Sequence, residues 1–256
     1  IAALEKAVAN NPGVEDTRHT SIHGQTFELQ HVQRLTGNYA AAWADIQKYG
    51  STKDVREADD ANTYGKMYTD MAGAFAKSAY TPENVNGLDM ATLADAMKKQ
   101  NFFATFFVNH TYFYGDRHKD IFMGPGRANN MSPTGWANAL NLPYSFHNDT
   151  MVTPISPLRS IQSGVTRVTA KSPIYPGGTV ITGEGNDLDA IVTLPSRKVD
   201  GADVPGTEML FHTYDHRINA AQALAAVTYT PAWQNKADDR IGSIQKGLLA
   251  DFVILE

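Results

Sequence analysis

The sequence predicts an α/β protein built on a parallel sheet or barrel. Short apolar segments of strand length alternate with segments that have helical spacing, an order of elements typical of parallel sheets. One of them, residues 101–110, is a continuous apolar and aromatic run, as expected for a strand buried on both faces. Because parallel strands direct their carboxyl ends to one face, polar residues that follow different strands are expected to converge there.

Composition excludes several classes of function. The chain has 256 residues, 42% of them hydrophobic, which is enough for one large domain or two modest ones. Its net charge is −5 and no run of Lys or Arg occurs, so nucleic acid is not an expected partner. No apolar run approaches the roughly 20 residues that span a bilayer, so we expect a soluble protein, cytoplasmic or periplasmic.

The order of elements follows from hydrophobic spacing and turn residues. Helices are expected at residues 1–8, over most of 27–99, at 132–141 and at 220–228. Strands are expected at residues 17–23, 101–110, 142–149 and near the end of 241–256, with a weak candidate at 119–123. Loops are expected at residues 49–62, 115–127 and 171–208, the last with a possible hairpin.

Three of the predicted strands end in residues that could bind a metal ion: His23, His110 and Asp149. Two neutral imidazoles and a carboxylate suit Zn²⁺ or a similar divalent ion, and a carboxylate beside an activated water can act as a general base. Since the chain has no cysteine, only His, Asp, Glu or a modified Lys could hold a metal. Each histidine taken alone is also consistent with a hydrogen-bonded structural role.

The end of the chain resembles the closing segment of the amidohydrolase superfamily. The resemblance is carried by Ile218-Asn219, Pro231-Ala232-Trp233, Gly242-Ser243-Ile244, Lys246-Gly247 and Ala250-Asp251-Phe252. It implies the C-terminal half of a (β/α)8 barrel, residues 1–240, followed by the start of a small β-sandwich domain at 241–256. Residues 37–87 and 169–210 are expected to be insertions.

A second set of residues resembles the branch related to N-substituted formamide deformylase. This set runs from Phe106 to His118, through His147-Asn148-Asp149, and on to Pro157-Leu158 and Arg167. The resemblance implies that His23 and His110 bind one or two divalent ions after the fifth and sixth barrel strands. It places Asp149 after the eighth strand as the metal-linked base, and Tyr112, Tyr114, Asp116 and His118 in the substrate pocket.

The resemblance implies hydrolysis of a C–N bond in a small amide or formamide-like substrate. The family's remaining metal ligands would lie upstream of Ile1, so the other half of the barrel is expected from the same polypeptide or a separate chain. A homo-oligomer is possible. The competing hypothesis is a non-catalytic relative that uses the pocket for binding or regulation.

Overall fold

The computed structural model describes residues 1–11, 13–38, 41–42, 99, 101–188, 190–194, 198–199, 202–203 and 209–254. The chain divides into two compact units, each formed from segments distant in sequence. Unit 1 comprises Ile1–Thr17, Phe27–Phe102 and Glu184–Tyr214, and unit 2 comprises Arg18–Thr26, Phe103–Gly183 and Asp215–Glu256. All the predicted site residues belong to unit 2.

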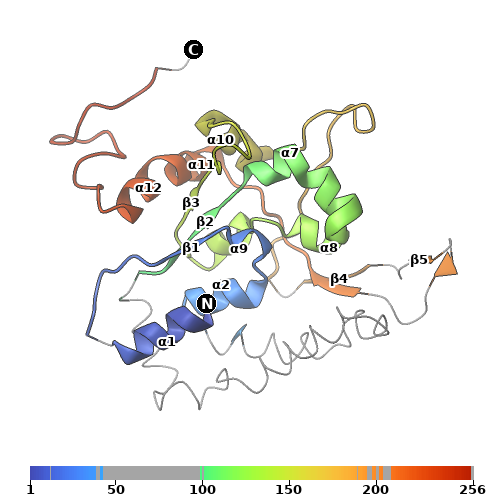
Figure 1. Cartoon of the computed structure of the whole chain (residues 1–256), viewed down its shortest axis with the longest axis horizontal. Helices are drawn as coiled ribbons and strands as arrows, with labels where there is room; N and C mark the ends of the chain where they lie inside the picture. The colour runs from blue at the N-terminus through green and yellow to red at the C-terminus, as the bar shows by residue number, and fades with distance from the viewer. Residues whose placement is uncertain are drawn as a thin grey trace. The chain divides into compact units, whose positions relative to one another are not determined.

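Unit 2 is built on a three-stranded parallel sheet, which confirms the predicted α/β class (Figure 1). Its strands are β1 (Thr20–Ile22), β2 (Phe103–Phe106) and β3 (Tyr144–Phe146), in that order across the sheet. Every residue of β2 and β3 is buried, as the uninterrupted apolar run in the sequence predicts. In register, Ile22 pairs with Thr105, and Phe106 pairs with Phe146.

Short helices connect and cover this sheet. They are η1 (Gly24–Thr26), α7 (Asn109–Arg117), the π-helix η2 (His118–Phe122), α8 (Gly124–Asn129), α9 (Thr134–Ala139), α10 (Pro157–Thr166), α11 (Ala220–Val227) and α12 (Tyr229–Gln234). Helices α11 and α12 pack on β3, and α10 packs on α7 and α11. At Gly164 an added Cβ would lie 3.1 Å from the Phe146 ring, so α10 approaches the sheet more closely than a larger residue allows.

Unit 1 contains α1 (Ala2–Asn10) and α2 (Leu29–Leu35), which a buried ion pair joins. The Arg34 guanidinium donates to both carboxylate oxygens of Glu5, at 2.8 and 2.6 Å. Two antiparallel pairs complete its described part: β4 (Ile191–Leu194) with β7 (Met209–His212), and β5 (Lys198–Val199) with β6 (Ala202–Asp203). The hairpin option for residues 171–208 is therefore confirmed in part.

Two predictions between β2 and β3 are wrong. The glycine-rich stretch 115–127, expected as a loop, is helical from α7 through η2 into α8, and this path includes the strand candidate 119–123. Gly115 serves packing within a helix, because an added Cβ would lie 2.8 Å from the side chains of Ile181 and Thr169. Gly115 therefore does not mark a turn.

The sheet order bears on the strand numbers that the resemblance implies for a barrel. Consecutive strands are neighbours in a (β/α)8 barrel. Since β2 pairs directly with β3, no strand lies between them. If β3 is the eighth barrel strand, β2 is the seventh and β1 the sixth, so His23 follows the sixth strand and not the fifth.

Of the remaining sequence-based predictions, some are confirmed, one has no support, and others concern residues that the structure does not describe. The helices predicted at 1–8, 132–141 and 220–228 correspond to α1, α9 and α11. Residues 241–254 form no strand, because no described segment pairs with them. Most of the predicted insertion 37–87 and the loop at 49–62 lie outside the described residues. Within the described part of the chain, no helix is long and apolar enough to cross a membrane.

A fully buried arginine ties the segment between α8 and α9 to the end of α10. Arg167 ends α10 in a left-handed conformation, with φ of 54°. Its guanidinium donates hydrogen bonds to four main-chain carbonyl oxygens: those of Asn129 (3.3 Å), Met131 (2.6 Å), Ser132 (3.1 Å) and Ile181 (2.7 Å). Burial lowers the pKa of Arg167 to about 9, so the group stays charged at neutral pH.

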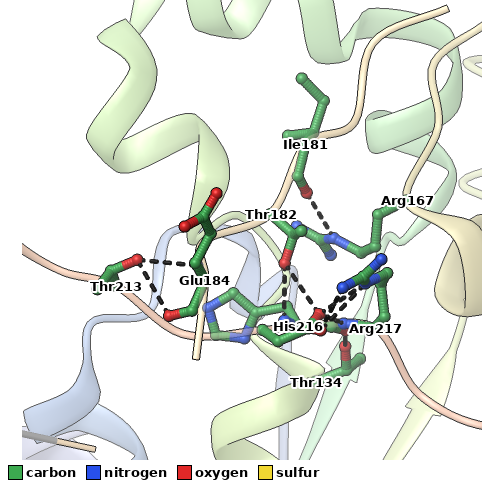
Figure 2. A network of polar contacts seen from close by, with 9 residues as sticks. Thr134, Arg167, Ile181, Thr182, Glu184, Thr213, His216 and Arg217 are labelled. Atoms are coloured by element: carbon green, nitrogen blue, oxygen red, sulfur yellow. Dashed lines mark hydrogen bonds and ion pairs between the residues drawn. The ribbon is translucent and has the colours of Figure 1, made fainter. Parts of the chain in front are cut away.

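His216 lies beside this arginine and is also fully buried (Figure 2). Its backbone amide donates to the Thr182 hydroxyl at 2.8 Å, and its carbonyl oxygen accepts a hydrogen bond from the Thr134 hydroxyl at 2.5 Å. Burial, and then the charge of Arg167, hold the pKa of His216 well below its usual value. The neutral imidazole places Nε2 3.1 Å from Asn130 Oδ1 and meets the Trp136 ring of α9 edge-on, with 4.8 Å between centroids.

Candidate functional site

His23 and Asp149 meet at the carboxyl edge of the parallel sheet. His23 directly follows β1, and Asp149 lies three residues beyond the end of β3. The imidazole Nε2 lies 4.0 Å from a carboxylate oxygen of Asp149, and the two side chains are 48% and 41% exposed. Both residues adopt left-handed backbone conformations, with φ of 57° and 46°, a region in which His and Asp are among the better tolerated residues. The sequence-based prediction that these strand ends converge is confirmed for this pair.

His110 occupies the first turn of α7, four residues after β2, and not the end of the strand itself. Its ring centroid lies 5.3 Å from that of Tyr114 and 5.4 Å from that of His118. The three residues are spaced by four, which places them on one face of a helix. This face, which runs from α7 into the first residue of η2, therefore carries three of the residues that the sequence assigns to the site.

His147 joins His23, His110, His118 and Asp149 in one cluster of polar side chains. The sequence-based prediction of the site did not include His147. It directly follows β3, and its ring centroid lies 4.5 Å from that of His23 and 5.1 Å from that of Phe107. Spacing along the chain does not reveal such a residue, because ligands on parallel strands come from distant parts of the sequence. Its place at a strand end, two residues before Asp149, could have identified it.

The electrostatics favour neutral imidazoles at His110, His118 and His147. Burial, followed by the proximity of His118 and His23, lowers the pKa of His110 to about 4, although Asp149 opposes this shift. Burial and then His23 also lower the pKa of His147, and burial lowers that of His118. Neutral rings retain a nitrogen lone pair, which is the state that binds a metal ion or accepts a hydrogen bond.

Several ring nitrogens of the cluster have no partner among the described residues. These are Nδ1 of His110, Nδ1 of His118 and Nε2 of His147, all buried. Imidazole nitrogens and a carboxylate are the donor types that Zn²⁺ takes, so the residues present fit part of a divalent metal site. Within the described parts of the chain, however, no three His, Asp or Glu side chains come together as a complete metal-binding group.

Tyr112 and Asp116 lie away from the α7 face that carries His110. With 3.6 residues per turn, both are displaced to other sides of the helix. The Tyr112 ring packs under the Arg159 guanidinium, with 4.1 Å from Cζ to the ring centroid. One carboxylate oxygen of Asp116 is buried without a hydrogen-bond partner in the described part of the chain. The substrate-pocket role of both residues stays a prediction.

Comparison with known proteins identifies the family of the chain. Residues 18–256 match the sequence model of the amidohydrolase family. The chain belongs to the amidohydrolase family. No curated protein and no solved structure matches it. Membership of the amidohydrolase family supports hydrolase activity, which in this family is generally metal-dependent. The match begins at Arg18, immediately before β1, and so includes every residue of the cluster.

Proposed function

We propose that this amidohydrolase cleaves a C–N bond in an amide or formamide-like small molecule, with Asp149 as general base. The observation that carries the proposal is the approach of His23 Nε2 to the Asp149 carboxylate, 4.0 Å apart and half-exposed at the carboxyl edge of the sheet. In (β/α)8 enzymes this edge is where active sites lie. The resemblance of residues 106–118 to the N-substituted formamide deformylase branch supports the substrate class.

His23, His110 and Asp149 are the proposed ligands of a divalent ion, most simply Zn²⁺. When bound, such an ion polarises a carbonyl oxygen and lowers the pKa of a water molecule. Asp149 takes a proton from the attacking water and transfers it to the leaving nitrogen, so that amide and water become carboxylic acid and amine. The remaining ligands would come from the other part of the barrel, in the same polypeptide or a second chain.

Tyr114 and His118 are the proposed residues nearest the substrate. Tyr114 donates a hydrogen bond from its hydroxyl to the Val152 carbonyl oxygen at 3.0 Å, which links α7 to the loop that carries Asp149. The His118 ring contacts the rings of His110 and Phe122, with 5.4 Å and 5.9 Å between the ring centroids. These side chains would border the substrate on the side of α7.

Removal of divalent metal tests the proposed function. The full-length protein is expected to release aniline from N-phenylformamide, and treatment with dipicolinate followed by desalting should lower the rate at least about 100-fold, because metal activation contributes several kcal/mol. Added Zn²⁺ should restore the rate, which is followed by aniline absorbance. A chelated protein that keeps its full rate would contradict metal dependence. Purified protein that binds the amide without turnover, with or without Zn²⁺, would favour the binding hypothesis.

A further inference from the structure

The loop after β3 holds Asp149 in a conformation that needs support. Its backbone φ of 46° lies in the left-handed region, and Met151 two residues later has φ of 88°. Non-glycine residues in this region are destabilised by about 1 kcal/mol or more, Asp less than most, so contacts with the surroundings help to select the conformation of residues 149 and 151. The direction of the Asp149 carboxylate therefore depends on what fixes residues 147–153.

Main-chain contacts close this loop on itself. The Asp149 carbonyl oxygen accepts hydrogen bonds from the amides of Val152, at 2.8 Å, and Thr153, at 3.4 Å. The hydroxyl of Thr153, which is 2% exposed, donates to the carbonyl oxygen of Asn148 at 2.6 Å. These bonds hold the peptide groups on both sides of Asp149 relative to the rest of the loop, which the Tyr114 hydroxyl links to α7 through the Val152 carbonyl oxygen.

Asn109 connects the loop to the body of unit 2. Its side-chain amide nitrogen donates to Asn148 Oδ1 at 2.5 Å and to the Ser160 hydroxyl at 3.2 Å. The Ser160 hydroxyl in turn donates to Asn148 Oδ1 at 3.1 Å. Its amide oxygen accepts a hydrogen bond from the Ser163 hydroxyl at 3.0 Å. Asn109, Ser160 and Ser163 are fully buried, so both N–H donors of the amide are used in the interior, where an unmade hydrogen bond is costly.

We propose that Asn109 is the positioning residue for Asp149. It is the first residue of α7, directly before His110, and it binds the side chain of the residue directly before Asp149. The Asn109 amide and the Ser160 hydroxyl thus hold Asn148 from the start of α7 and from α10, and Ser163 supports Asn109. The inference rests on the proposed metal-linked role of Asp149 and deepens it.

Zinc affinity tests the positioning role without any substrate. In the full-length protein, Asn109→Ala should weaken Zn²⁺ binding roughly 10- to 100-fold, the loss typical of removing a group that orients a ligand. The measurement is competition with a chromophoric chelator. In the Asp149→Ala background, Asn109→Ala should cause no further loss. Equal losses in both backgrounds would overturn the proposal.

Matched variants separate positioning from general stability. Thr105→Val removes a hydroxyl from another buried polar cluster of the same sheet. This hydroxyl lies 3.1 Å from the Ser145 hydroxyl and accepts a hydrogen bond from the Gln234 side-chain amide at 3.3 Å. Thr105→Val should lower the urea midpoint yet leave Zn²⁺ affinity and kcat unchanged. Asn109→Ala should lower kcat more than it raises KM for N-phenylformamide. A loss of affinity in Thr105→Val equal to that in Asn109→Ala would contradict a specific role.

A urea experiment keeps the proposal testable if the protein binds no Zn²⁺, a result that would count against the proposed function alone. Glycine adopts positive φ without strain, so Asp149→Gly removes the need to hold residue 149. If Asn109 imposes the conformation of Asp149, Asn109→Ala should lower the urea midpoint less in the Asp149→Gly background than in the wild type. Equal shifts in the two backgrounds would overturn the proposal.

Discussion

Replacing Asp149 with asparagine is expected to lower kcat roughly 10²- to 10⁴-fold, the range that a general acid–base group contributes. The amide cannot accept the proton of the attacking water, so the step assigned to the carboxylate is lost. Asparagine tolerates the left-handed conformation that residue 149 adopts, with φ of 46°, so the backbone should persist. The rate of aniline release from N-phenylformamide by the full-length protein measures the effect.

The control for this prediction is the exposed carboxylate of η2, Asp120, which contacts the hydroxyl of Tyr175 and lies outside the proposed site. Asp120→Asn should leave the rate unchanged. Because the Asp149 side chain is 41% exposed, Asp149→Asn should also leave the urea midpoint nearly unchanged. An Asp149→Asn protein with wild-type turnover would remove this residue from the reaction.

Replacing Arg167 with methionine is expected to lower the free energy of unfolding by about 3–5 kcal/mol. Methionine restores much of the buried volume, but it removes the donor of four carbonyl oxygens, three of them in buried hydrogen bonds. The free energy lost through these unmade hydrogen bonds exceeds what is gained by removing a buried charge. Urea unfolding monitored by circular dichroism gives the value.

Arg167→Lys serves as the intermediate case. Lysine keeps the charge but offers three donors on a point-like ammonium, which cannot match the planar fork of the guanidinium. It should therefore destabilise the protein less than methionine does. A methionine variant as stable as the wild type would show that water or a local shift satisfies the carbonyl oxygens, and that the buried arginine is dispensable.

The strands of unit 2 could be predicted because burial on both faces leaves a clear record in the sequence. Residues 101–110 are uninterrupted in their apolar character, and β2 lies within them with every residue buried. The convergence of His23 and Asp149 followed from one rule, that parallel strands direct their carboxyl ends to the same face. Neither prediction needed knowledge of side-chain conformation.

What failed depended on tertiary contacts. Gly115 resembles a turn residue, yet it lies within α7. A glycine is needed there because Ile181 and Thr169 leave no room for a Cβ. The position of His110 in α7 depends on where β2 ends, and strand ends are not marked in a continuous apolar run. His147 belongs to the cluster through its ring contact with His23, which no spacing along the chain reveals.

The most direct test of the site is a crystal structure of the full-length protein with zinc, using anomalous scattering at the zinc edge. We expect a peak bonded to His23 Nε2, to a ring nitrogen of His110 and to the Asp149 carboxylate, at the distances of about 2.0–2.2 Å that Zn²⁺ makes with nitrogen and oxygen. A peak held by His110 and His118 alone, or no peak within bonding distance of Asp149, would contradict this expectation.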